Sequence, residues 1–151
     1  MRSPEELTQI FRATGRKITP QRQSIFRALH HSTVHPTAEA VYETVRAEMP
    51  SISLRTVYQT LHDLADLGEI HAIDLGTGSG RFDPNTRPHH HLVCISCGWV
   101  QDVEADFPQV TASVESRTGF EVTATEIVFR GNCRSCAERS ADHEADVSAI
   151  P

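Results

Sequence analysis

Histidine, cysteine and aspartate, three residue types that commonly bind metal ions, are crowded into residues 88–102, PHHHLVCISCGWVQD. This stretch of fifteen residues holds three histidines, two cysteines and one aspartate. Soft thiolates select zinc, whereas imidazole and carboxylate groups together also suit iron and manganese. The stretch therefore offers ligands for two chemically different metal ions.

The four cysteines form two Cys-x-x-Cys pairs, Cys94 with Cys97 and Cys133 with Cys136, separated by 35 residues. A helix and a strand fit between the pairs and could bring them together, and two such pairs complete a tetrahedron of thiolates. We therefore predict a structural zinc site. The spacing leaves three alternatives open: a thioredoxin-like redox motif, although neither pair has a βαβ context, an iron–sulfur cluster, or four ordinary buried cysteines.

The histidines predict a separate site, because four cysteines already fill a zinc shell. His89 and His91 share one face of an expected strand, while His90 points the other way. Asp102 lies on the next expected strand, and Asp83 ends the preceding hairpin. With a histidine from the N-terminal half, these groups would suit Fe²⁺ or Mn²⁺. A solvated histidine cluster is the alternative, and we assign no metal to the remaining histidines His30, His31, His62, His71 and His143.

The first half of the chain must position these ligands, and its pattern predicts helices and a hairpin. Helices are expected over 4–14, from Pro20 with Thr19 as cap, from Thr37 to Pro50, and from Ser53 to Gly68. The last carries a buried stripe, consisting of Leu54, Val57, Leu61, Leu64 and Leu67. Residues 69–75, the turn 76–80 and residues 81–83 read as a hairpin wing. A winged helix-turn-helix is the architecture that this order predicts.

The second half changes character from residue 84. Short strands are expected at 90–93 and 99–103, a helix at 107–117, and a strand over 120–131, followed by a polar tail. The fold class is therefore α+β, with a winged-helix domain at 1–83 and a small α/β metal-binding domain at 84–151.

Composition fits a globular protein, with 38% hydrophobic and 23% charged residues. No signal-peptide-like segment and no apolar run of roughly 18 residues is present, so we expect a cytoplasmic protein without a membrane partner. The net charge of −6 is polarised. Residues 1–60 hold eight Lys/Arg against five Asp/Glu, and residues 84–151 hold five against ten. This asymmetry favours a modestly basic DNA-facing module joined to an acidic one.

The motifs ITPQR, HPTAEAVY, TVYQTLHDLADLG, RFD, HHHLVC-x-x-CG and GNC-x-x-C follow one another over residues 7–138. In this order they resemble the ferric uptake regulator family. The resemblance implies a homodimeric, metal-dependent transcription factor, not an enzyme, that binds double-stranded DNA at an inverted-repeat operator. It also implies that residues 84–151 form the dimerisation domain.

The resemblance assigns roles to individual residues. It implies structural zinc at Cys94, Cys97, Cys133 and Cys136, and a regulatory Fe²⁺ or Mn²⁺ at His35, Asp83, His89, His91 and Asp102. The resemblance, together with the polar face of the last N-terminal helix, favours as DNA-contacting residues Arg55, Thr56, Tyr58 and Gln59. We expect phosphate contacts from Arg16, Lys17 and Arg22. A further metal site of some ferric regulators is missing, because its positions hold Gln109 and Thr125.

Two aspartates at the regulatory site, in RFD and VQD, resemble the peroxide-sensing branch of the family. That branch implies repression that ends when Fe²⁺-dependent chemistry oxidises His35 or His89. An iron, zinc or nickel uptake regulator is the alternative within the family. Outside it, two histidines and a carboxylate also resemble a non-haem iron enzyme, although no substrate pocket is evident, and a zinc-stapled interaction module would bind zinc without metal-dependent DNA affinity.

Overall fold

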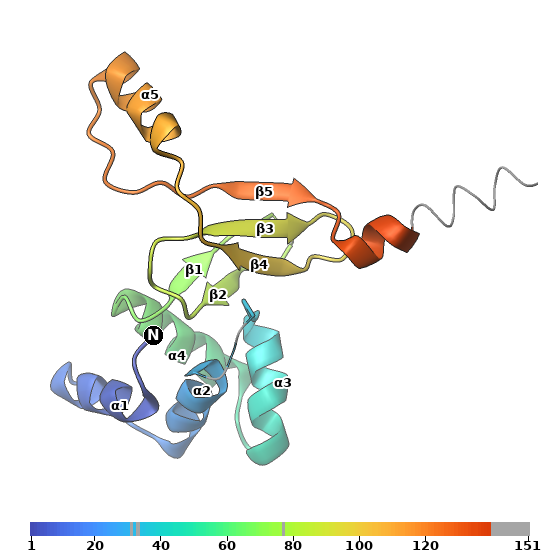
Figure 1. Cartoon of the computed structure of the whole chain (residues 1–151). Helices are drawn as coiled ribbons and strands as arrows, with labels where there is room; N and C mark the ends of the chain where they lie inside the picture. The colour runs from blue at the N-terminus through green and yellow to red at the C-terminus, as the bar shows by residue number, and fades with distance from the viewer. Residues whose placement is uncertain (31, 33, 77, 140–151) are drawn as a thin grey trace, which may run out of the picture. The chain divides into compact units, whose positions relative to one another are not determined.

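The computed structural model describes residues 1–30, 32, 34–76 and 78–139 (Figure 1). The chain divides into two compact units, the first spanning Met1–Thr86 and the second beginning at Arg87. Helices and two small sheets make up an α+β fold, as the sequence predicts. Among the described residues, no helix has both the length and the apolar character needed to cross a membrane.

Four helices build most of the first unit: α1 (Pro4–Ala13), α2 (Pro20–His30), α3 (Ala38–Glu48) and α4 (Leu54–Asp66). The starts of α2, α3 and α4 are capped by the side-chain oxygens that the sequence predicts, those of Thr19, Thr37 and Ser53. Thr37 accepts a hydrogen bond from the Ala40 amide at 3.2 Å, and Ser53 accepts one from the Thr56 amide at 3.1 Å. These bonds satisfy amide groups that a helix leaves without an internal partner at its first turn.

One hydrophobic core joins these helices. Its largest fully buried side chains include Phe11 and Phe26, whose rings meet edge to face with centroids 4.9 Å apart. On α4 the predicted stripe is buried at Val57, Leu61 and Leu64, whereas Leu54 is 36% exposed. Leu54 is the first residue of the helix, and its side chain leans toward the N-terminus, beyond the packed turns. Including Leu54 in the buried stripe was therefore wrong.

The predicted wing is an antiparallel hairpin of β1 (His71–Ile73) and β2 (Arg81–Asp83). Strand β2 is also hydrogen-bonded to the loop that precedes α3. The Phe82 amide donates to the Pro36 carbonyl at 2.9 Å, and the Arg81 guanidinium donates to the His35 carbonyl at 2.9 Å. The wing thereby fixes the backbone at His35 next to the end of β2.

The second unit contains a three-stranded sheet in the order β4-β3-β5. Strand β3 (His90–Cys94) pairs antiparallel with β4 (Val100–Val103) and parallel with β5 (Val128–Gly131). The strand expected over 120–131 forms only at 128–131, which corrects the prediction. Residues 128–131 pair with β3, and the Ile127 carbonyl accepts from the His91 amide, whereas residues 120–126 have no neighbouring strand among the described residues. A strand needs such a partner for its backbone groups, whatever its side-chain pattern.

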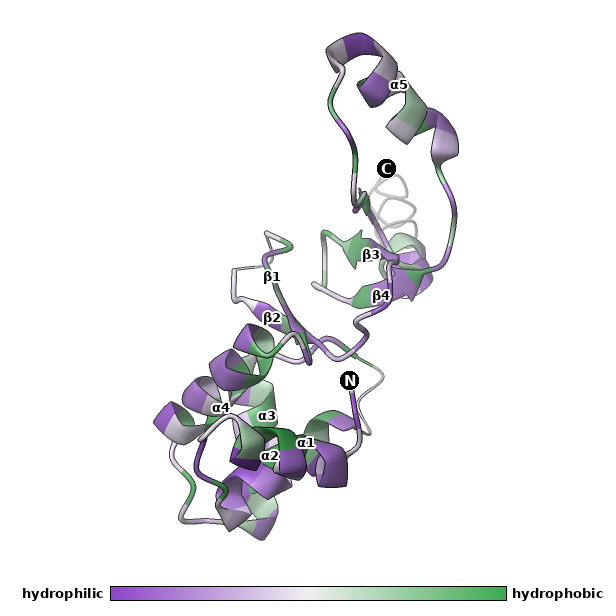
Figure 2. Cartoon of the chain, turned by 90° about the vertical axis from the view of Figure 1, so that its left-hand side faces the viewer, coloured by the Kyte–Doolittle hydropathy of each residue, from purple (hydrophilic) through white to green (hydrophobic). Residues whose placement is uncertain are grey.

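Helix α5 (Pro108–Thr118) stands away from this sheet on two extended connections (Figures 1 and 2). It begins and ends one residue later than expected, and Gly119 ends it with a left-handed φ of 67°. None of its residues is buried. Val110 and Val114 are exposed, and Phe120 directly beyond the helix is exposed as well. This helix therefore contributes an apolar surface that the described chain does not cover.

Candidate metal centres and DNA-binding face

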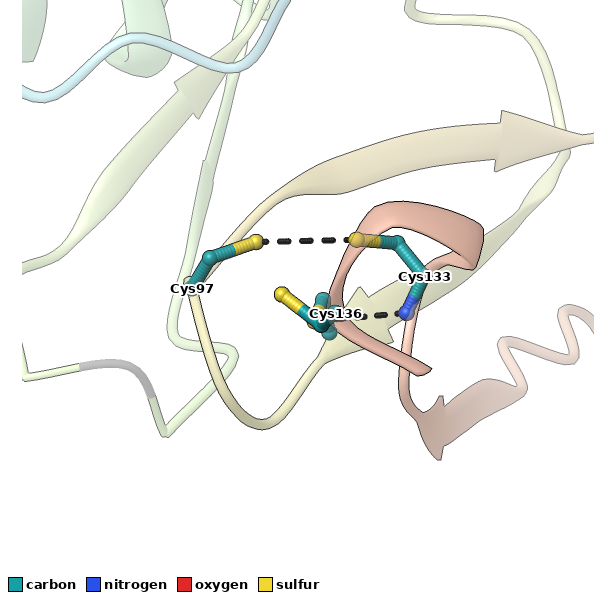
Figure 3. Close-up of side chains that lie close together, drawn as sticks. Cys97, Cys133 and Cys136 are labelled. Carbon is teal, nitrogen blue, oxygen red and sulfur yellow. Dashed lines mark hydrogen bonds between the residues drawn. The ribbon is translucent and has the colours of Figure 1, made fainter. Parts of the chain in front are cut away.

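All four cysteines converge within the second unit. Cys94 ends β3, Cys97 follows in the next turn, and Cys133 and Cys136 lie where β5 runs into a helical segment at 134–139. Their sulfur atoms all lie within 4.8 Å of one another, and those of Cys97 and Cys133 are 3.9 Å apart (Figure 3). The parallel pairing of β3 with β5 brings the two Cys-x-x-Cys pairs together.

The surroundings of the sulfur atoms differ. The Cys133 amide lies 3.4 Å from the Cys94 sulfur, and this and other backbone donors lower the pKa of Cys94 to about 6. Hydrogen bonding to Cys133, reinforced by desolvation and the other thiols, raises the pKa of Cys136 to about 12. Protons and a divalent cation compete for such thiols, and binding a metal releases the protons. Four soft sulfur donors at this separation fit zinc.

A second set of donors in the same unit consists of two imidazoles and a carboxylate. The Nε2 atoms of His89 and His91 are 3.0 Å apart, and Asp102 Oδ1 lies 3.6 Å from His89 Nε2. His91 and Asp102 are direct partners in the pairing of β3 with β4. Both histidines are buried, and Asp102 is partly buried. This nitrogen and oxygen set fits Fe²⁺ or Mn²⁺ better than the sulfur set does.

His90 takes no part in that set, as the alternation of the strand predicts. Its ring lies beside Phe107, with centroids 5.1 Å apart, and its Nδ1 accepts a hydrogen bond from the Ile127 amide at 3.2 Å. At the two positions where the sequence resemblance predicts the loss of a further metal site, Gln109 is exposed and the Thr125 hydroxyl lies 3.2 Å from the Thr111 hydroxyl. Neither side chain supplies the carboxylate or imidazole of that further site.

The first unit contributes His35 and Asp83, both buried, with His35 Nε2 and Asp83 Oδ1 3.6 Å apart. His35 lies in the loop before α3, and Asp83 is the last residue of β2. The hydrogen bonds between β2 and this loop explain why residues 48 positions apart in the chain meet. The Asn85 amide also donates to Asp83 Oδ1 at 2.7 Å, which fixes the carboxylate.

The predicted DNA-contacting residues on α4 differ in their exposure and contacts. Arg55 and Gln59 are exposed, and Thr56 is partly buried. Tyr58 is exposed too, but its hydroxyl donates to Glu39 on α3 at 2.7 Å, which raises the pKa of Tyr58 and lowers that of Glu39. The Tyr58 hydroxyl therefore has a partner within the protein already.

The expected phosphate contacts gather around Asp63, which the sequence analysis did not single out. Arg22 pairs with Asp63 at 2.6 Å, Arg16 lies 3.7 Å from it, and the Gln59 amide donates to it at 3.2 Å. Arg22 also donates to the Lys17 carbonyl at 3.2 Å. A phosphate would have to compete with these contacts for Arg22. The sequence indicates the contact between Gln59 and Asp63 through their spacing of four residues on one helix, but it does not indicate the contacts of Asp63 with the two arginines.

Comparison with known proteins agrees with this geometry. The model of the Ferric uptake regulator family matches residues 13–130. The peroxide-responsive repressor PerR of Staphylococcus aureus is 36% identical over 138 residues, which cover 89% of this chain and 92% of the relative.

Two solved structures illustrate the shared fold. The Vibrio cholerae ferric uptake regulator has 27% identity and a TM-score of 0.72, covering 83% of this chain and 98% of its own. PerR from Streptococcus pyogenes, described as a peroxide sensor and gene regulator, has 27% identity and a TM-score of 0.52, covering 90% and 94%. The family match, the sequence relative and the two donor sets lead to one conclusion: this chain belongs to the ferric uptake regulator family and is a metal-responsive regulator.

Proposed function

We propose that this protein is a homodimeric transcriptional repressor that requires a regulatory metal ion to bind DNA and responds to hydrogen peroxide. The observation that carries the proposal is the 36% identity to a peroxide-responsive repressor along most of both chains. It is supported by a candidate ligand set whose carboxylates, Asp83 and Asp102, are both aspartates.

Zinc would be bound by Cys94, Cys97, Cys133 and Cys136 in a structural role. Each thiolate lies within reach of the others, and no position is left for a substrate or an exchangeable ligand when all four bind. The ion would link the end of β3 and the turn after it, which hold Cys94 and Cys97, to the segment after β5, which holds the other pair. We therefore assign this ion to the stability of the second unit.

The regulatory Fe²⁺ or Mn²⁺ would be bound by His35 and Asp83 from the first unit and by His89, His91 and Asp102 from the second. Each unit has its own ligands already close together, which supports this assignment. An ion that needs ligands from both units favours the arrangement in which they meet. If that arrangement spaces two recognition helices to match an operator, metal and DNA binding become thermodynamically linked.

Helix α4 would enter the major groove, with Arg55, Thr56, Tyr58 and Gln59 toward the bases and with Arg16, Lys17 and Arg22 near phosphates. The exposed side chains of Arg55 and Gln59 support this role. An arginine can donate two hydrogen bonds to a guanine in the major groove. Because the protein would be a symmetric dimer, we expect double-stranded DNA with an inverted repeat.

The substitution Arg55→Ala tests the DNA-binding face. Loss of one arginine contact to a base costs about 1–3 kcal/mol, so operator affinity should fall roughly 5- to 150-fold. Arg46→Ala is the matched control, because Arg46 is an exposed arginine on α3 that pairs with Glu43. Fluorescence anisotropy with a labelled operator measures both variants. Equal affinity of Arg55→Ala and the unaltered protein would remove Arg55 from the interface.

Peroxide sensing would use the same regulatory site. When bound, Fe²⁺ would supply the redox chemistry that activates hydrogen peroxide, which Mn²⁺ would not supply there. The chain provides the target: one oxygen atom of the peroxide would be added to the ring of His35 or His89, and the other would leave as water. An oxidised ring is a poorer ligand, so the two units would lose their link and repression would end.

The experiment that tests the function is operator binding under anaerobic conditions, with zinc-loaded protein and added Fe²⁺ or Mn²⁺, before and after peroxide. We expect both ions to support binding and peroxide to abolish it with Fe²⁺ alone. Mass spectrometry of the His35 and His89 peptides should show a gain of one oxygen atom. Equal loss of binding with Mn²⁺ would instead indicate oxidation of the cysteines.

A metal-uptake regulator is the second candidate. The observation that favours it is the likeness to the Vibrio cholerae ferric uptake regulator, whose identity of 27% equals that of the Streptococcus pyogenes peroxide sensor. Backbone likeness does not distinguish aspartate from glutamate ligands. DNA binding that needs Fe²⁺, Zn²⁺ or Ni²⁺ and does not respond to peroxide would identify this function.

A further inference from the structure

The three consecutive histidines, His89 directly before β3 and His90 and His91 on it, differ in what their Nδ1 atoms contact. His89 Nδ1 lies 2.7 Å from the Arg87 carbonyl oxygen, and His91 Nδ1 lies 3.1 Å from Glu126 Oε1. A carbonyl or carboxylate oxygen accepts hydrogen bonds, so each of these contacts favours a proton on Nδ1. His90 is the opposite case, because its Nδ1 accepts from a backbone amide.

These contacts distinguish the predicted metal ligands His89 and His91 from His90. A neutral imidazole carries one proton, so a proton on Nδ1 leaves the lone pair of Nε2 available to a metal. In His89 and His91 the two Nε2 atoms lie 3.0 Å apart, which directs both lone pairs to one place. In His90 the lone pair is on Nδ1 and accepts a hydrogen bond from the Ile127 amide, so it is not available to a metal ion.

Glu126 is the side-chain partner in this arrangement, and the sheet holds it in position. The His91 amide donates to the Ile127 carbonyl at 3.0 Å, and the Ile127 amide donates to the His90 ring. Glu126 therefore directly precedes a residue, Ile127, whose amide and carbonyl are both bonded to histidines of β3. Its side chain is 53% exposed and belongs to no part of the core. Packing alone does not explain its position.

We infer that Glu126 is a positioning residue for the regulatory metal ion: its carboxylate accepts the Nδ1 proton of His91, fixes the ring and presents Nε2 to the ion. The inference rests on the proposed function in so far as His91 is a ligand. A carboxylate behind a ligating histidine fixes its tautomer and increases its basicity, and loss of such a partner weakens metal binding about 10- to 100-fold.

The test uses the full-length, zinc-containing protein with Glu126→Ala, Glu126→Gln and the matched control Glu121→Gln. Glu121 is an exposed carboxylate in the same segment, five residues earlier. We expect Mn²⁺ affinity, measured by anaerobic competition with a chelating dye, to fall about 10- to 100-fold in Glu126→Ala. Glu126→Gln keeps an acceptor oxygen and should retain most of the affinity, and Glu121→Gln should match the unaltered protein.

A second readout needs no metal at the regulatory site. Proton–nitrogen NMR of the histidine rings should show His91 protonated at Nδ1 in the unaltered protein and shifted toward Nε2 in Glu126→Ala. If the unaltered protein fails to bind Mn²⁺, the proposed function fails, while this spectrum still tests the contact. Unchanged affinity and tautomer in Glu126→Ala would overturn the inference. Equal weakening by Ala and Gln with an unchanged His91 tautomer would also overturn it, in favour of direct ligation by Glu126.

Discussion

The two units of this chain are stabilised in different ways. Every residue of the main buried apolar cluster lies in the first unit, where four capped helices and the wing surround it. Among the described residues of the second unit, the buried apolar side chains are Val93 and Val100, besides the cysteines Cys94 and Cys136. Small units with little apolar burial commonly depend on a metal or a partner surface. From this difference we expect the first unit to fold on its own core, and the second to depend on the zinc ion and the second subunit proposed above.

The largest expected effect is the removal of zinc. Chelation, or the substitution Cys97→Ser, should unfold the second unit while α1–α4 remain folded, because structural zinc contributes about 10–16 kcal/mol of apparent binding free energy in small zinc-folded peptides. Hydrogen exchange resolved by residue measures this directly. The amides of β3 should lose protection, and those of α4 should keep it.

Restoration by added zinc is the control for chelation, and Cys97→Ser should not be restored. Slow exchange that persists in β3 without zinc would contradict the contrast between the units. It would mean that the sheet and its few buried apolar residues keep the second unit folded without zinc.

The core of the first unit gives the next largest effect. Leu61→Ala should destabilise that unit by about 2–5 kcal/mol, because Leu61 is fully buried and its truncation leaves a cavity. Zinc content should not change. Leu54→Ala on the same helix is the matched control, because Leu54 is 36% exposed and surface substitutions usually change stability by less than about 1 kcal/mol. Urea unfolding followed by the helical circular dichroism signal compares them, and equal losses would contradict the assigned core.

The apolar surface of α5 tests the dependence on a second subunit. Val114 is 41% exposed on a helix with no buried residue. Val114→Asp should weaken dimerisation about tenfold or more, because a charge would be placed in an apolar interface. Ser113→Asp adds the same charge at the neighbouring residue and should have a smaller effect. Analytical ultracentrifugation measures the monomer–dimer equilibrium, and an unchanged dimer in Val114→Asp would exclude α5 from the interface.

The sequence predicts the first unit well because its signals are local. Thr37 and Ser53 start helices, Gly68 ends α4 with a left-handed φ of 69°, and the stripe of Val57, Leu61 and Leu64 repeats at helical spacing. Such features depend on neighbours within one or two turns. The prediction fails where a distant partner decides the outcome, as in residues 120–126, for which the described structure offers no strand to pair with.

The residues of the candidate site also differ in how far the sequence predicts them. The cysteine pairs and the alternation of His89 and His91 are visible in the sequence because their spacing carries the chemistry. Glu126 and Asp63 act through contacts with residues far away in the chain or on another element. Their positions follow from the pairing of β3 with β5 and from the packing of α4 beside α2, which no local pattern encodes.

The smallest expected effect is at the start of α4. Ser53→Ala removes the cap of this helix and should cost about 1 kcal/mol, which lowers the melting temperature of a unit of this size by about 4–8 °C. The Ser53 hydroxyl also lies 2.9 Å from the Thr56 hydroxyl, so the first turn, which carries Arg55 and Thr56, should become less ordered. We therefore expect a modest fall in operator affinity as well.

Ser51→Ala is the matched control, because the Ser51 side chain is exposed and caps no helix. Scanning calorimetry and operator titration separate the two consequences of Ser53→Ala. A lower melting temperature with full operator affinity would mean that DNA binding restores the first turn, so that the cap stabilises the unit without preparing its DNA-binding face. Unchanged stability would contradict the cap itself, because the Ser53 oxygen then contributes no more than the water that replaces it.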